Sequence, residues 1–358
     1  MEAQKKAIPN TNQQKWNLLN EEIISLNKEG RYPLAKRVAI EIIKAKEEKY
    51  GKNSIEITSH LNYLALLFQF EGDFVKAERL HKRTLKILEQ FHGKQHSSVA
   101  TVLLSLGEVY LLQQKYSEAE LYFKKAILTV KNSTGHDNLI YILGINYLGK
   151  LFEEQGNYTK AELYFNEALE LLETTYGRED PRTEQILSNL GKLYLKTNML
   201  KEAEILFRKS IEVLEKALGK EHYSVIREMH NLAVVYQKQK KYDESEKLFI
   251  ESISRLEKIL GSEHFKLSVP LNNLATLYIE LKKYDLAEGL LIKALKIREK
   301  TFGREHSSLN NLLRNLIIIY KSSQKPINVS ILESRIKKTE ENHIQSKPLS
   351  NNVPGQKV

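Results

Sequence analysis

Apolar residues recur along the chain at helical spacing and group into pairs of helices. Leu61, Leu64 and Phe68 are three and then four residues apart, which places them on one face of an amphipathic helix. The polar run at 71–73 interrupts this pattern, and a second stretch of helical spacing begins at Phe74. The pattern therefore predicts a unit made of helix A, a turn, helix B and a second turn.

This unit repeats every 42 residues without an insertion. Several registers share the period, which chance does not produce, so the chain is a repeat array. One register is Gly51, Gly93, Gly135, Gly177, Gly219, Gly261 and Gly303. A second register marks the start of helix B and is Tyr32, Phe74, Tyr116, Tyr158, Leu200, Tyr242 and Tyr284. A third lies in helix A and is Leu64, Leu106, Leu148, Leu190, Leu232, Leu274 and Leu316.

The sequence pattern of these units resembles the tetratricopeptide repeat in its 42-residue, kinesin-light-chain-like form. The resemblance is carried by Asn273-Leu-Ala-Thr-Leu-Tyr278, by Lys283-Tyr-Asp-Leu-Ala-Glu288 and by Gly303-Arg-Glu-His306. It covers residues 16–322. It implies an all-α fold, a right-handed superhelical solenoid of stacked antiparallel helix pairs, whose usual role is to bind other proteins.

Both ends of the chain depart from the repeat. We expect residues 1–15 to be a flexible N-terminal segment and residues 16–322 to form the solenoid. Pro326 replaces the turn aromatic, so residues 323–345 are expected to form a degenerate C-terminal capping helix that shields the last apolar face. Residues 346–358 are rich in Ser, Pro, Asn and Gly and are expected to be a disordered tail.

Composition narrows the class of protein. The chain has no cysteine, which excludes disulfides and thiolate chemistry, and no apolar run long enough to span a membrane. No apolar segment follows Lys5 and Lys6, so we expect no signal peptide and a cytoplasmic location. The net charge of +10 is spread along the chain and forms no basic stripe, which argues against a dedicated nucleic-acid binder.

The concave face of the solenoid, lined by the A helices, is the predicted binding groove. At one groove-facing position the later repeats carry asparagine, and these residues are Asn189, Asn231, Asn273 and Asn315. An Asn side chain both donates and accepts hydrogen bonds, so a ladder of them could hold the backbone of an extended peptide. The family resemblance implies the same use. The alternative is that each Asn bonds a neighbouring helix within the array, and both roles are compatible.

Charges at groove positions are unevenly distributed. The third and fourth A helices supply Glu108, Glu153 and Glu154, offset by Lys150, whereas later ones supply Lys192, Lys196, Arg227 and Lys238. We therefore expect a protein or peptide partner with acidic residues in the C-terminal half of the groove, and the alternative is an ordinary solvated face. On this hypothesis Asn231→Ala weakens binding with little change in stability.

Apparent catalytic and metal motifs have simpler interpretations. Residues 144–150 fit the phosphate-binding pattern G-x-x-x-x-G-K, but Leu151 replaces the required Ser or Thr and Gly149 falls within a helix. A recurring histidine series invites a metal hypothesis, yet equivalent points of neighbouring repeats lie too far apart to share an ion, and turn capping is expected instead. The members are His96, His222, His264 and His306. We predict no catalytic residue, no metal and no cofactor.

The sequence therefore favours a non-enzymatic scaffold or adaptor that binds an extended peptide or partner protein in its concave groove. Two alternatives remain open. One is a regulatory sensor that responds to a peptide, and the other is a basic nucleic-acid-binding scaffold, for which steeply salt-dependent binding would be diagnostic.

Overall fold

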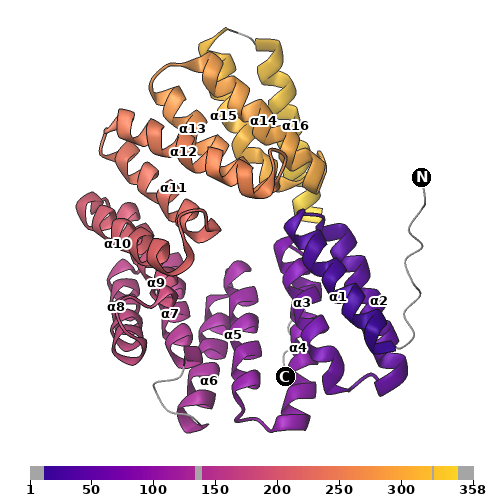
Figure 1. Ribbon diagram of the computed structural model, residues 1–358. Helices are drawn as coiled ribbons and strands as arrows, with labels where there is room; N and C mark the ends of the chain where they lie inside the picture. The colour runs from indigo at the N-terminus through magenta and orange to yellow at the C-terminus, as the bar shows by residue number, and fades with distance from the viewer. Residues whose placement is uncertain (1–11, 134–138, 325, 346–358) are drawn as a thin grey trace, which may run out of the picture. The chain divides into compact units, whose positions relative to one another are not determined.

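The computed structural model describes residues 12–133, 139–324 and 326–345, and within them it contains sixteen α-helices and no strand (Figure 1). The first eleven helices are α1 (Asn12–Lys28), α2 (Tyr32–Tyr50), α3 (Thr58–Phe70), α4 (Phe74–His92), α5 (Ser97–Leu112), α6 (Tyr116–Ser133), α7 (Leu139–Glu154), α8 (Tyr158–Tyr176), α9 (Glu184–Lys196), α10 (Leu200–Leu218) and α11 (Tyr223–Lys238). The last five are α12 (Tyr242–Leu260), α13 (Ser268–Glu280), α14 (Tyr284–Phe302), α15 (Asn310–Ser322) and α16 (Pro326–Gln345). Odd-numbered helices are the A helices of the repeats, and even-numbered helices are the B helices.

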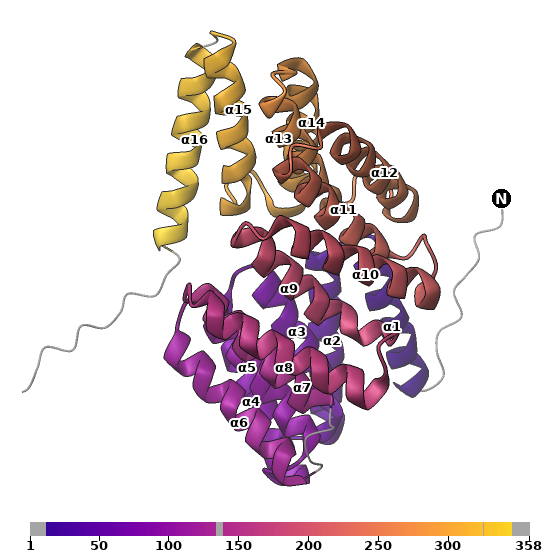
Figure 2. The same cartoon turned by 90° about the vertical axis from the view of Figure 1, so that its left-hand side faces the viewer.

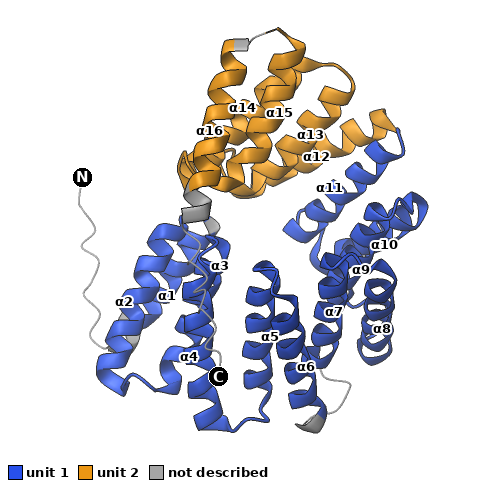
Figure 3. Cartoon of the chain, turned by 180° about the vertical axis from the view of Figure 1, so that it is seen from behind, with its two compact units in different colours: residues 1–240 blue, residues 241–358 orange. Residues whose placement is uncertain are grey.

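The chain divides into unit 1, residues 1–240, and unit 2, residues 241–358 (Figure 3). Within each unit every helix contacts the next one along the chain, as α15 and α16 do where they lie side by side in Figure 2. Short 3-10 helices precede several A helices: η1 (Ile55–Ile57), η2 (Pro181–Thr183), η3 (Phe265–Leu267) and η4 (Ser307–Leu309). The predicted all-α solenoid class is confirmed.

The predicted end segments are only partly described. Residues 1–11 and 346–358 lie outside the described residues, and α1 begins at Asn12, four residues before the predicted solenoid boundary. The helix α16 occupies 326–345, within the segment predicted as a capping helix.

Small residues in the A helices make room for large aromatic residues of the B helices. A Cβ atom added at Gly149 would lie 2.6 Å from the ring of Phe165, and one added at Gly191 would lie 2.7 Å from the ring of Phe207. Both rings are fully buried. The alternation of small and large residues at the crossing of helices A and B is therefore a packing requirement.

The histidine series caps helices. His96 and His222 precede A helices, and each accepts a hydrogen bond at 3.2 Å through Nδ1 from the backbone N–H two residues later. His264 and His306 do the same for the 3-10 turns before α13 and α15. The predicted turn capping is confirmed, and it occupies one ring nitrogen of each histidine.

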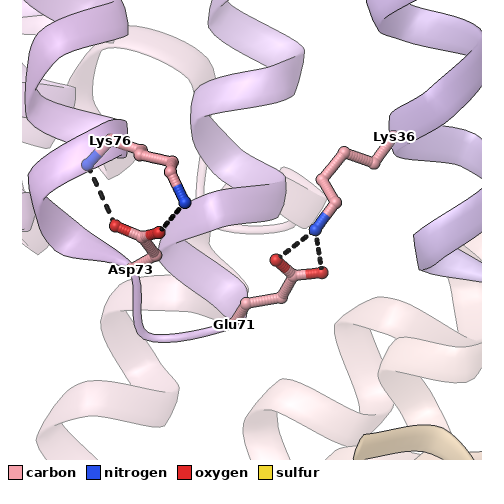
Figure 4. Close-up of polar contacts among 4 residues, drawn as sticks. All are labelled: Lys36, Glu71, Asp73 and Lys76. Atoms are coloured by element: carbon pink, nitrogen blue, oxygen red, sulfur yellow. Dashed lines mark hydrogen bonds and ion pairs between the residues drawn. The ribbon is translucent and has the colours of Figure 1, made fainter. Parts of the chain in front are cut away.

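A second capping device starts some B helices. Figure 4 shows Asp73 at the start of α4, where its carboxylate accepts a hydrogen bond of 3.1 Å from the backbone N–H of Lys76 and binds the ammonium group of the same lysine. Asn157 accepts the equivalent backbone hydrogen bond at the start of α8. The turn before each B helix also needs a residue with positive φ, which is Gly30, Gly72, Gln114, Gly156, Asn198, Lys240, Lys282 and Gln324.

Candidate functional site

The four predicted ladder residues lie on A helices, two in each unit. Asn189 is on α9 and Asn231 on α11 of unit 1, whereas Asn273 is on α13 and Asn315 on α15 of unit 2. All four side chains are half-buried. Because α9 and α11 contact each other, Asn189 and Asn231 occupy equivalent positions on neighbouring helices.

Two ladder residues bond the preceding A helix. Asn189 Nδ2 donates to Oδ1 of Asn146 on α7 at 2.9 Å, and Asn315 Nδ2 donates to Oδ1 of Asn272 on α13 at 2.8 Å. Asn146 is completely buried, and its own Nδ2 has no hydrogen-bond partner among the described residues. The alternative role, in which each Asn bonds a neighbouring helix within the array, is therefore observed for Asn189 and Asn315, whose bonds connect one repeat to the next.

Asn231 has a different kind of partner. Its Nδ2 donates at 3.1 Å to Oε2 of Glu228, one turn earlier on α11. Glu228 is completely buried, and its other carboxylate oxygen accepts a hydrogen bond of 3.0 Å from Nε of Arg227. Arg227 also binds Glu184 on α9, so a three-residue charge cluster joins the two A helices. Burial raises the pKa of Glu184, and the positive charge of Arg227 opposes that rise.

The predicted groove cations differ in availability. Lys196 forms an ion pair of 3.4 Å with Glu153 on α7, and Arg227 is held by Glu184 and Glu228. In contrast, Lys192 on α9 is exposed and has no ion pair within 4 Å among the described residues. Neighbouring protein atoms partly desolvate the Lys192 ammonium group and so lower its pKa, an effect that nearby Glu228 opposes.

Charges on consecutive A helices therefore compensate one another. Lys150 on α7 lies 3.9 Å from Glu108 on α5, and the pairs just described join α9 to α7 and α11 to α9. The sequence does change from acidic to basic residues along the predicted groove, but ion pairs between neighbouring A helices neutralise many of these charges. Lys192 and the exposed Lys238 on α11 are the predicted cations that form no ion pair in the described part of the chain.

Two buried partners of the ladder, Glu228 and Asn146, were not anticipated from the sequence. Glu228 lies at a position of helix A that is apolar in other repeats, such as Val102 and Ile186, so a carboxylate at this core-facing position was an available signal. The position of Asn146 is polar in most repeats, as at Ser188 and Asn272, and therefore gave no comparable signal. We name Asn189, Lys192, Arg227 and Asn231 the A-helix surface of unit 1.

The apparent phosphate-binding motif is part of a helix. Residues 144–150, which resemble a phosphate-binding loop, lie inside α7, where the backbone N–H groups take part in the helix. In the described residues no three His, Asp or Glu side chains are placed to share a metal ion. None of the described helices is long and apolar enough to cross a membrane.

Comparison with known families agrees with the repeat and the fold. A family model described as tetratricopeptide repeat matches residues 56–127, 141–216 and 225–300, which is more than half of the chain. The chain belongs to the tetratricopeptide repeat family. No curated protein matches the sequence.

Solved structures of tetratricopeptide repeat proteins share the fold at low identity. A Rap protein complexed with Competence and Sporulation Factor is 14% identical, with a TM-score of 0.64 over 96% of this chain and 90% of that one. A signal transduction ATPase with a tetratricopeptide repeat sensor, from Pyrococcus horikoshii, is 15% identical, with a TM-score of 0.57 over 90% of this chain and 47% of that one. A putative kinesin light chain from Podosopora anserina is 21% identical over 57% of this chain and 98% of that one, with a TM-score of 0.48.

Proposed function

We propose that the protein is a non-enzymatic interaction scaffold that holds an extended segment of a partner protein on the A-helix surface of unit 1. The observation that carries this proposal is the shared arrangement of Asn189 and Asn231 at equivalent positions of α9 and α11. Each is anchored through Nδ2 by a buried acceptor on the array, and each keeps an amide oxygen that accepts no hydrogen bond from a described residue. Two such groups, one repeat apart, suit the regularly spaced N–H groups of an extended backbone.

Charge adds a preference to this surface. Lys192 lies between the two asparagines in sequence and has no ion pair, while burial already lowers its pKa. A partially desolvated ammonium group gains most from a nearby anion, so an acidic side chain of the partner is best placed against Lys192. Arg227 is satisfied by two carboxylates, and we assign it to holding the surface together.

Selection from a library of random linear peptides displayed on their own messenger RNA tests this proposal. We expect peptides to enrich on the whole protein and to bind Asn189→Ala/Asn231→Ala at least tenfold more weakly, since two hydrogen bonds would be lost. Asn146→Ala is the matched control, because it removes the same bond between α7 and α9 but leaves the amide of Asn189 in place. Equal weakening by both variants would show that the asparagines act only through the stability of the array.

A regulatory sensor is the second candidate function. The Rap protein complexed with Competence and Sporulation Factor covers nearly the same length as this chain, which favours a sensor of similar build. A selected peptide should then change the small-angle X-ray scattering of the whole protein, whereas a passive scaffold would keep its scattering profile. The nucleic-acid alternative has less support, since the phenolic hydroxyls of several tyrosines are bonded to glutamates, as at Tyr110 and Tyr194.

A further inference from the structure

Glu228 is an unusual residue for the inside of a helical repeat. Its side chain is completely buried on α11, at a position that is apolar in several other repeats. A buried carboxylate needs hydrogen bonds to both oxygens, and here Arg227 Nε supplies one and Asn231 Nδ2 supplies the other. Both contacts lead directly to the A-helix surface of unit 1.

The chemistry of a carboxylate determines which way Asn231 faces. An ionised carboxylate only accepts hydrogen bonds, so the amide nitrogen of Asn231 must point at Glu228 and its oxygen must point away. The ion pair of Glu228 with Arg227 is the arrangement expected of a carboxylate that accepts through both oxygens. The Oδ1 atom of Asn231 is not a buried atom and accepts no hydrogen bond from the described residues.

Asn189 lacks this constraint. Its partner is the amide of Asn146, and two amides can pair in either of two orientations by rotating both side chains. In either case one polar atom of the buried Asn146 stays unsatisfied. Asn189 can therefore turn either its oxygen or its nitrogen toward a bound segment, whereas Asn231 keeps its nitrogen toward Glu228 and its oxygen toward the segment.

We propose that Glu228 is a positioning residue that fixes Asn231 as a hydrogen-bond acceptor, so that the bound segment must supply a backbone N–H opposite Asn231 and cannot carry proline there. This inference rests on the proposed function and specifies the chemistry of that same surface. The specificity it describes is for the backbone and is independent of the side chain at that point.

Glu228→Gln is the informative variant because it has nearly the same shape and reverses the orientation. The new side chain keeps its oxygen toward Arg227, which can only donate, and places its NH2 group toward Asn231. Asn231 must then rotate its amide to accept that bond, and its own NH2 group turns outward. The surface would change from an acceptor to a donor without losing a side chain.

The experiment uses the tightest peptide selected on the whole wild-type protein and methylates its backbone nitrogens one at a time. We expect methylation of the backbone nitrogen opposite Asn231 to weaken binding to the wild-type protein by about fivefold, the effect of losing one hydrogen bond. The same methylation should not change the affinity of the peptide for Asn231→Ala or for Glu228→Gln. Peptides reselected on Glu228→Gln should tolerate proline at that position.

Each other outcome is also decisive. An unchanged methylation penalty in Glu228→Gln would overturn the positioning role, and no penalty at any position in wild type would overturn the acceptor role of Asn231. Failure to select any peptide, or equal binding to Asn189→Ala/Asn231→Ala, would remove the proposed function itself.

Nuclear magnetic resonance of the wild-type protein keeps the inference testable if Glu228→Gln does not fold. The side-chain amide signal of Asn231 is assigned by its disappearance in Asn231→Ala. One of its two protons should exchange with solvent much more slowly than the other, because it is bonded to a buried carboxylate. Equally fast exchange of both protons would contradict the bond to Glu228.

Discussion

Tyr194 on α9 donates a hydrogen bond of 2.7 Å to Glu162 on α8, which lies 32 residues earlier in the chain. The same separation joins four other pairs, which are Tyr110 with Glu78, Tyr236 with Glu204, Tyr278 with Glu246 and Tyr320 with Glu288. Each bond ties helix A of one repeat to helix B of the preceding repeat. Burial, together with the bonded glutamate, raises the pKa of Tyr194 to about 12, so the hydroxyl remains a donor.

One junction between repeats replaces both members of this pair together. Lys36 stands at the glutamate position and Phe68 at the tyrosine position, and the Lys36 ammonium lies 5.0 Å from the centre of the Phe68 ring. That ammonium also binds Glu71 at the end of α3 (Figure 4). A cation over a ring thus replaces a hydroxyl bonded to a carboxylate.

Tyr194→Phe should lower the free energy of unfolding by about 1–2 kcal/mol, because a half-buried Glu162 loses its donor. Chemical denaturation followed by circular dichroism measures this change. The triple variant Glu162→Lys/Tyr194→Phe/Thr197→Glu copies the arrangement of Lys36, Phe68 and Glu71, and it should recover most of the loss. If the triple variant is less stable than Tyr194→Phe, the two arrangements are not interchangeable.

Two glycines within helices should respond oppositely to alanine. Gly149→Ala places a Cβ atom 2.6 Å from the buried ring of Phe165 and should destabilise the protein by about 1–3 kcal/mol. Gly289→Ala on α14 meets no atom within 4 Å and should stabilise by up to about 1 kcal/mol, since alanine favours helix. Thermal melts of both variants decide the matter, and a shift of the same sign in both would contradict the packing explanation.

Stability should fall in mild acid because of three buried histidines. Burial lowers the pKa values of His60, His81 and His230 to about 4, from an ordinary value of 6.5. The unfolded chain binds protons at these sites below about pH 6.5, whereas the folded chain does not until about pH 4, so stability is lost as the pH falls through this window. Each site contributes up to about 3 kcal/mol of that loss.

His81→Leu isolates one of these sites. Both ring nitrogens of His81 lack a hydrogen-bond partner among the described residues, so leucine should also be more stable at neutral pH. Urea unfolding at several pH values should show a smaller loss of stability in acid for this variant. Parallel curves for wild type and His81→Leu would mean that His81 is protonated equally in both states.

Asn231→Ala should lower the stability of the protein more than the sequence alone predicted. From the sequence we expected little effect on stability, but the amide of Asn231 satisfies the buried Glu228, so its removal should destabilise the protein by about 1–3 kcal/mol. Leu232→Ala removes a buried side chain and should cost about 2–5 kcal/mol. Denaturation measures both losses, and an unaltered midpoint for Asn231→Ala would argue against the bond to Glu228.

The period of the sequence was sufficient to predict the helix pairs, because a spacing repeated in several registers fixes which residues face the core. Caps were predictable too, since His96 and its equivalents share a short polar character before a helix. Ion pairs between helices were not predictable, because a lysine without an ion pair, such as Lys192, and a paired one, such as Lys196, look the same in sequence. Nor could the sequence show that Arg227 turns toward Glu184 and Glu228, which depends on the rotation of neighbouring helices.

The bonds between repeats have a consequence for how such a chain can change in length. Glu173 with Lys209 in unit 1, and Glu257 with Lys293 in unit 2, both join residues 36 apart, just as the tyrosine bonds join residues 32 apart. Several repeats thus carry one half of a bond to the preceding repeat and one half of a bond to the following repeat. Duplication or deletion of such a repeat within a unit would restore the same bonds between neighbouring repeats. The gene can therefore gain or lose whole repeats without the evolution of a new interface.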